Sequence, residues 1–219
     1  MRLVQFKDTA GAQHVAVVED ENTLIPLKGV STTRELATIA LAKGMTMIEK
    51  AKLRMGDTTV DYNEVARDGR LLPPVTHVDP AHFLVTGTGL THLGSASARA
   101  NMHKADNKDA NETDSMKMFR MGVEGGKPKA GEHGVQPEWF YKGDGSIVAN
   151  PGADIPSPSF ALDGSEEPEI AAVYVIDHDG TPVRIGFAIG NEFSDHVMER
   201  QNYLYLAHSK LRHCSMGPE

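Results

Sequence analysis

Two apolar segments joined by a short polar turn constrain the fold of this chain more than any other feature. The segments EIAAVYVI (169–176) and VRIGFAIG (183–190) are long enough for β-strands, and HDGTP between them is typical of a hairpin turn. We therefore expect an antiparallel hairpin in the second half of the chain.

Three acidic residues flank this hairpin. Glu167 and Glu169 stand two apart at the entry of the first segment, so on an extended chain their side chains point the same way. Glu192 follows the second segment, and antiparallel pairing returns it to the same end. Taken alone, the first pair is more typical of a solvated acidic strand entry than of a metal site. Three converging carboxylates instead favour a Mg²⁺ or Mn²⁺ site.

Composition limits the class of partner. The 219 residues are 40% hydrophobic, enough for one large and one small domain. The net charge of -8, without a long run of Lys or Arg, argues against nucleic-acid and anionic membrane surfaces. No segment predicts a membrane span or a secretory signal, so we expect a cytoplasmic protein with small-molecule partners. Cys214, the single cysteine, excludes an internal disulfide and a cysteine zinc cluster.

The first third of the chain predicts strands and then helices. Strands are expected at 2–6, 14–19 and 23–27, where apolar runs alternate with turn residues. Thr32 and Glu35 have capping-box spacing before a helix over 32–44, and further helices are expected at 45–55 and, more weakly, at 62–68. Two prolines in LLPPV predict a boundary, and we place a linker at 71–80.

The remainder predicts an irregular β domain with an insertion. The apolar segment 82–87 reads as a strand that enters a glycine-rich turn. The polar stretch that follows has too few apolar positions for a core element, which indicates a surface insertion or a lid. Short β runs with turn signals resume at Trp139. We expect one domain over 1–72 and another over 81–219.

Five blocks in the second half occur in the order and spacing of one enzyme family. These are PEWFYKGDGSIV, NPGADIPSP, EPEIA, GFAIGNEFSD and HSKLRHCSMGPE, and over 85–219 they resemble the fumarylacetoacetate hydrolase superfamily. The resemblance implies an α+β fold, with a small N-terminal α/β domain before an irregular β-roll domain. We expect this roll to lack its C-terminal strands. Relatives are usually homodimers.

The resemblance also implies a metal site and several further roles. It assigns the metal to Glu167, Glu169 and Glu192, the last in place of the usual Asp, with Mg²⁺ as the ion and Mn²⁺ or Ca²⁺ as alternatives. Lys210 matches the active-site lysine that faces developing negative charge. Lys142 matches a lysine that is a candidate for holding the substrate carboxylate. Glu138 stands where the sugar-acid dehydratase branch places a catalytic acid or base.

The stretch GTGLTHLGSA (87–96) departs from the pattern of the family's hydrolases. Ser95 stands where those enzymes carry a water-activating histidine, although His92 or His103 could substitute. Thr91, His92 and Ser95 are candidate substrate-binding residues. The stretch is not a dinucleotide fingerprint, because a third glycine is missing where that motif requires one.

These assignments favour one function over two others. We expect a Mg²⁺-dependent dehydratase that acts on a 2-keto-3-deoxy sugar acid, a pentonate, through an enolate. A hydrolase that cleaves a C–C bond of a diketo acid is the alternative, and Ser95 disfavours it. A non-catalytic protein that binds a metal or a sugar acid is the third, because the chain stops where family members continue.

Overall fold

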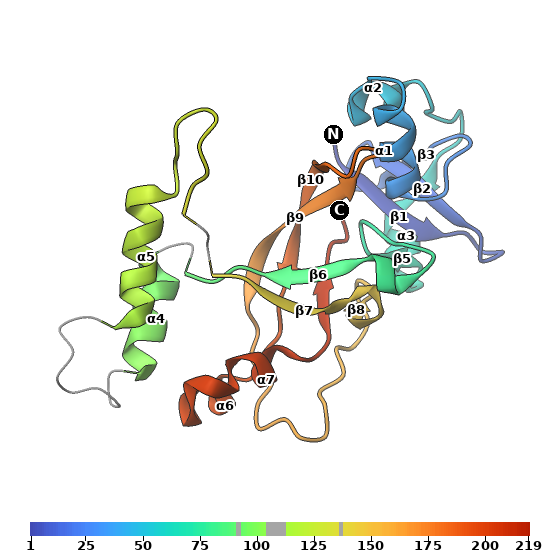
Figure 1. Ribbon diagram of the computed structural model, residues 1–219. Helices are drawn as coiled ribbons and strands as arrows, with labels where there is room; N and C mark the ends of the chain where they lie inside the picture. The colour runs from blue at the N-terminus through green and yellow to red at the C-terminus, as the bar shows by residue number, and fades with distance from the viewer. Residues whose placement is uncertain (91–92, 104–112, 136–137) are drawn as a thin grey trace.

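The computed structural model describes residues 1–90, 93–103, 113–135 and 138–219 (Figure 1). It combines helices with three sheets: a five-stranded sheet ordered β4-β3-β2-β1-β5, a four-stranded sheet ordered β8-β11-β10-β9, and the pair β6-β7. Strand pairs are antiparallel except β8 with β11. Among the described residues, no helix is long and apolar enough to cross a membrane.

The five-stranded sheet carries a hydrophobic cluster on each face. Its strands are β1 (Leu3–Lys7), β2 (Gln13–Val18), β3 (Thr23–Pro26), β4 (Val60–Asp61) and β5 (Leu71–Leu72). Because side chains alternate along a strand, Phe6 joins one cluster and Val15 the other. Helix α3 (Tyr62–Arg67) adds Val65 to the first, while α1 (Thr33–Leu41) and α2 (Met47–Lys52) add Leu36 and Ala51 to the second.

Side-chain caps define the starts of α1, where Thr32 was predicted, and of α2, where no cap was predicted. The Thr32 side chain accepts a hydrogen bond from the Glu35 backbone N–H, which satisfies one of the free donors of the first turn of α1. Thr46 and Glu49 form a complete capping box at α2. Gly44 has a φ of 61°, which is the left-handed conformation often found after the end of a helix. Glycine adopts this conformation more easily than other residues. The predicted helices are therefore confirmed.

The predicted linker at 71–80 begins too early. Leu71 and Leu72 form β5, pair with Phe6 and Gln5 of β1, and are buried. Gln5 is itself fully buried and donates a hydrogen bond of 2.6 Å to the Pro73 carbonyl. The two prolines therefore end a strand and do not mark an exposed connection. A proline has no backbone N–H to donate, but its carbonyl oxygen can still accept a hydrogen bond, as that of Pro73 does.

The polar insertion contains two helices. These are α4 (Leu93–His103) and α5 (Asp114–Gly125), which pack against each other beyond the far end of β6 (Leu84–Gly87) and β7 (Phe140–Asp144) (Figure 1). The expectation of no core element was right for α5, which buries no residue, but wrong for α4, where Ala96 and Ala100 are buried. Alanines need little apolar volume to pack a helix closely.

The expected hairpin is formed by β9 (Pro168–Ile176) and β10 (Pro182–Asn191). Asp177 closes the turn: its side chain accepts from the Asp179 and Thr181 backbone N–H groups, each at 2.9 Å. Gly180 follows with a φ of 82°, which other residues rarely adopt. Strands β11 (Cys214–Met216) and β8 (Val148–Ala149) extend the sheet beyond β10.

Two short helices after the hairpin were not predicted. They are α6 (His196–Gln201) and α7 (Leu206–Lys210). The Asp195 side chain caps α6 by accepting from the Met198 backbone N–H at 2.9 Å. Asp195 three residues before Met198 is the sequence signal that could have located α6. The two helices return the chain toward the hairpin and place Lys210 beside it.

Candidate metal and acid–base site

The hairpin brings the three predicted carboxylates together. Glu169 lies opposite Gly190, and the Glu192 backbone N–H donates to the Glu167 carbonyl at 2.9 Å. One carboxylate oxygen from each of Glu167, Glu169 and Glu192 lies within 4.8 Å of the others. Glu167 and Glu192 are largely buried, with side chains 19% and 12% exposed, whereas Glu169 is exposed. One side of the cluster therefore faces solvent.

Asn191 shapes the backbone that presents Glu192. Its side-chain oxygen accepts hydrogen bonds from the Glu167 and Phe193 backbone N–H groups, both at 3.1 Å. Phe193 has a φ of 47°, a left-handed conformation that is uncommon for a bulky residue. Such strain persists only where surrounding contacts enforce it, and it concentrates at functional sites.

The Lys210 ammonium lies within the carboxylate cluster. Its Nζ donates to both oxygens of Glu167, at 2.6 and 2.8 Å, and lies 3.1 Å from Glu192 and 3.4 Å from Glu199. Lys210 is 3% exposed. Burial lowers the pKa of Lys210, but the surrounding negative charges outweigh burial and raise it above its ordinary value. The site thus has a resident cation that stays protonated.

The pKa values of the two buried carboxyl groups are shifted in opposite directions. Burial raises the pKa of Glu192 to about 7, although the charge of Lys210 opposes this. Burial acts the same way on Glu167, but the charge and hydrogen bonds of Lys210 outweigh it and lower the pKa of that carboxyl. Glu192 Oε1 is buried and forms an ion pair with Lys210 Nζ at 3.1 Å, but among the described residues it accepts no hydrogen bond. A buried oxygen of this kind fits a metal cation.

Residues not singled out from the sequence orient Glu167. Ser194 donates to its Oε1 at 2.7 Å, and His196 Nε2 lies 2.8 Å from the same atom. The set of Glu167, His196 and Glu199 also offers ligand atoms within 4.8 Å of one another. Glu199 is 5% exposed and accepts from the Ser209 hydroxyl. The only sequence signal for these residues was their position directly after Glu192.

Lys142 is almost fully buried next to the carboxylate cluster, and it contributes to the wall of a pocket of about 390 Å³. It is 2% exposed, and its Nζ donates to the Phe193 carbonyl at 3.0 Å and to the Lys210 carbonyl at 2.8 Å. Burial lowers the pKa of Lys142 to about 8, although the nearby Glu192 charge opposes this. One ammonium therefore ties together the two segments that carry Glu192 and Lys210.

Strand β7 connects Glu138 to the same region. Its first residue, Phe140, has its ring centroid 5.8 Å from Lys210 Nζ, and Glu138 precedes it by two positions. Glu138 forms an ion pair with Arg99 of α4. Ser95 lies half-buried on α4, one turn before Arg99. Thr91 and His92 lie outside the described residues, as does the side chain of His103.

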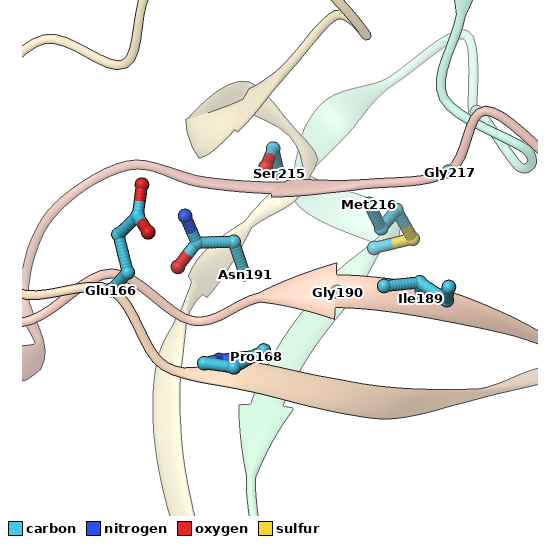
Figure 2. A pocket seen from close by; sticks show the side chains of 8 residues that line it. All are labelled: Glu166, Pro168, Ile189, Gly190, Asn191, Ser215, Met216 and Gly217. Atoms are coloured by element: carbon cyan, nitrogen blue, oxygen red, sulfur yellow. The ribbon is translucent and has the colours of Figure 1, made fainter.

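A pocket of about 220 Å³ lies on the other side of the same strands (Figure 2). Its walls include Glu166, Pro168 and Asn191, which alternate in sequence with Glu167 and Glu192. The candidate metal ligands do not line it. The carboxylate cluster and this pocket are therefore separate features of the same two strands.

Comparison with known proteins shows the fold. No family model and no curated protein matches the sequence. Solved structures do match over the whole of this chain, among them a 2-keto-3-deoxyarabinonate dehydratase in a hexagonal crystal form, at 23% identity and a TM-score of 0.64. A 2-keto-3-deoxy-D-arabinonate dehydratase complexed with magnesium and 2,5-dioxopentanoate matches at 23% identity and 0.59, and an apo form at 22% and 0.58.

This chain spans 66% of the length of the hexagonal form, and 65% of the lengths of both the magnesium complex and the apo form. At such identities the likeness concerns architecture. The mixed α and β fold expected from the five sequence blocks is therefore supported, and this chain shares the fold of the dehydratases.

Proposed function

We propose that this chain binds a divalent cation, Mg²⁺ or alternatively Mn²⁺ or Ca²⁺, through Glu167, Glu169 and Glu192, and dehydrates a 2-keto-3-deoxypentonate. The observation that carries the proposal is the convergence of three carboxylates at one hairpin end. Glu192 Oε1 is buried there and has an ion pair with Lys210 but no hydrogen bond in the described part of the chain. Carboxylate oxygens are the ligands these cations prefer. The fold shared with a dehydratase complexed with magnesium and 2,5-dioxopentanoate gives further support.

The cation, when bound, would supply Lewis acidity that makes the C3 protons of a 2-oxo acid easier to remove. The chain's own residues would handle charge and protons. Lys210, already held among negative charges, would stabilise an enolate as it forms. Glu138 would take a proton from C3 and return it to the departing C4 hydroxyl. Loss of one water from a 2-keto-3-deoxypentonate gives 2,5-dioxopentanoate after tautomerisation.

Lys142 would serve this reaction as a positioning residue. Because its ammonium is bound to two backbone carbonyls, it fixes Lys210 and the turn after Glu192. The sequence-based role, direct contact with the substrate carboxylate, would fall to the third N–H of that ammonium, because two are donated to the backbone carbonyls. The assembly expected from the family, a homodimer, remains a proposal that light scattering would test.

The direct test is product analysis by NMR. Purified protein with Mg²⁺ and a 2-keto-3-deoxypentonate should yield 2,5-dioxopentanoate, while an acylpyruvate should be cleaved slowly or not at all. Glu138→Gln should lower kcat by roughly 10² to 10⁴, because proton transfer is lost while the metal ligands remain. Efficient acylpyruvate cleavage without dehydration would instead favour the hydrolase.

A matched pair of variants tests the metal site. Glu167→Gln removes a charge from the cluster and should weaken Mg²⁺ binding, measured by calorimetry. Glu166→Gln removes the same charge one residue earlier, where the exposed side chain lines the pocket on the other side (Figure 2). Equal Mg²⁺ affinities of the two variants would contradict the proposed ligand set.

A further inference from the structure

The Glu138 carboxylate lies in a space that two glycines keep free. Gly87 pairs with Phe140 across β6 and β7, and a Cβ at Gly87 would overlap the Phe140 ring. Two residues further along, a Cβ at Gly89 would overlap Glu138 Oε2. Gly87 and Gly89 thus allow the segment before β7 to approach β6 closely. This close approach gives a structural reason for the two glycines, which do not form a dinucleotide-binding motif.

Arg99 binds one oxygen of this carboxylate and leaves the other without a partner. Its Nη1 pairs with Glu138 Oε1, and the two side chains are only 18% and 17% exposed. Within the described residues, Glu138 Oε2 is buried and makes no hydrogen bond. Arg99 Nη2 would lie 3.3 Å from a Cβ at Gly89, so the guanidinium borders the same space. The two oxygens of one carboxylate therefore have different surroundings.

A buried carboxylate oxygen without a partner is costly, and native structures contain few. The arrangement suits a group that exchanges a proton with an incoming molecule, because one oxygen sets the orientation and the other keeps its lone pairs. An arginine is suited to the first task, since its planar guanidinium has fixed donor directions. It is also provided by a different element, α4, so its position depends on how α4 packs.

We propose that Arg99 is a positioning residue for Glu138, and that Gly89 provides the space in which the free oxygen acts as acid and base. The inference rests on the proposed dehydratase function. In the first step the C3–H bond breaks and its electron pair forms a C2–C3 double bond, while the carbonyl pair moves to the C2 oxygen and Glu138 becomes a carboxylic acid. In the second, the C2 carbonyl re-forms and the C2–C3 pair forms a C3–C4 double bond. Glu138 returns its proton to the C4 hydroxyl, which leaves as water with the C4–O electron pair.

Kinetics of four variants test this role: Arg99→Ala, Glu138→Gln, the double variant, and Arg67→Ala as the control. Arg67 is an exposed helical arginine of α3, far from this pair in sequence. We expect Arg99→Ala to lower kcat by about 10², the scale of a misplaced catalytic group, while Mg²⁺ affinity is unchanged. The double variant should be no slower than Glu138→Gln, because Arg99 acts only through Glu138.

Chemical rescue separates positioning from general structural support. Millimolar guanidinium should restore part of the kcat of Arg99→Ala and none of that of Glu138→Gln. Gly89→Ala should lower kcat like Arg99→Ala, because its methyl group occupies the place of Oε2. The proposal is overturned if Arg99→Ala is as active as Arg67→Ala, if the losses multiply in the double variant, or if guanidinium has no effect.

If the protein dehydrates no pentonate, the proposed function is overturned. The interaction between Arg99 and Glu138 can still be measured in that case, because it does not depend on turnover. Urea unfolding of the wild type, both single variants and the double variant gives the coupling between Arg99 and Glu138 without turnover. Non-additive stabilities are expected from a partly buried pair. Additive stabilities would overturn the positioning role whatever the activity.

Discussion

The five-stranded sheet and the region around the β9–β10 hairpin bury different kinds of side chain. Around the first sheet the largest fully buried side chains are mainly apolar, with Phe6, Leu24 and Leu36 among them. Around the hairpin they are Ser194, Asp195 and Ser209, with Lys142 and Lys210 nearly as buried. The hydrophobic effect therefore stabilises the first region. The second contains a charged cluster whose burial is costly unless the charges are paired.

The largest effect is expected from removing the central charge of that cluster. Lys210→Met leaves Glu167 and Glu192 close together without their cation, so without metal the free energy of unfolding should fall by about 3–5 kcal/mol. Mg²⁺ should restore much of this loss by supplying positive charge. Turnover should fall by roughly 10² to 10³ even with Mg²⁺, because a preorganised charge is missing from the transition state.

Urea unfolding with a chelator and with Mg²⁺, together with the product assay, measures both effects. Lys28→Met is the control, because the ion pair of Lys28 with Asp57 is exposed and such pairs contribute about 0–1 kcal/mol. A loss of stability that is identical with and without Mg²⁺ would mean that the cation does not occupy this cluster.

One substitution made in both regions tests the comparison directly. Phe6 is 2% exposed and Phe187, on β10, is 59% exposed. Phe6→Ala should lower the free energy of unfolding by about 3–5 kcal/mol through lost burial and a cavity, with no rescue by Mg²⁺. Phe187→Ala should change it by less than about 0.5 kcal/mol. Equal losses in urea unfolding would indicate that the Phe187 face is covered in solution.

A smaller effect is expected from the histidine beside Glu167. His196→Gln removes the ring nitrogen that lies 2.8 Å from Glu167 Oε1, and loss of such an orienting contact typically weakens metal binding 10- to 100-fold. His178→Gln is the matched control, because His178 lies exposed with Asp177 and Asp179 at the hairpin turn. Calorimetry measures the Mg²⁺ affinity of the two variants. A greater loss in His178→Gln would move the metal site to that turn.

The sequence predicted those parts of the molecule that depend on local pattern. Two apolar segments and the HDGTP turn were sufficient for the hairpin, and with it for the meeting of Glu167, Glu169 and Glu192. The capping residue Thr32 was sufficient to locate the start of one helix.

Features that depend on tertiary contacts were not predictable. The burial of Leu71 and Leu72 depends on β1, more than sixty residues away. The carbonyl partners of Lys142 and the pairing of Glu138 with Arg99 join segments distant in sequence, and no local pattern encodes them. The resemblance to a family pointed to Lys142 and Glu138, but it supplied neither Arg99 nor these contacts.

The smallest predicted effect concerns pH and the buried Lys142. Burial lowers the pKa of Lys142 from 10.5 to about 8, with the Glu192 charge opposing. Between these values the unfolded chain binds more protons than the folded one, so this group's contribution to stability rises with pH. It is lost as the pH falls through about 8. Tyr62 packs against an apolar core of the five-stranded sheet, and burial raises its pKa to about 12, so that group does not titrate near pH 8.

Urea unfolding in chelator at pH 8 and pH 9 should therefore show the wild type gaining stability relative to Lys142→Met, by at most about 1.4 kcal/mol per pH unit. The upper limit of pH 9 is chosen to restrict the contribution of Cys214, whose pKa burial raises from 9.0 to about 11. That group acts oppositely above pH 9, because its folded form then holds the extra proton. Parallel stabilities of the two proteins over this interval would show that the carbonyls of Phe193 and Lys210 keep the ammonium charged despite its burial.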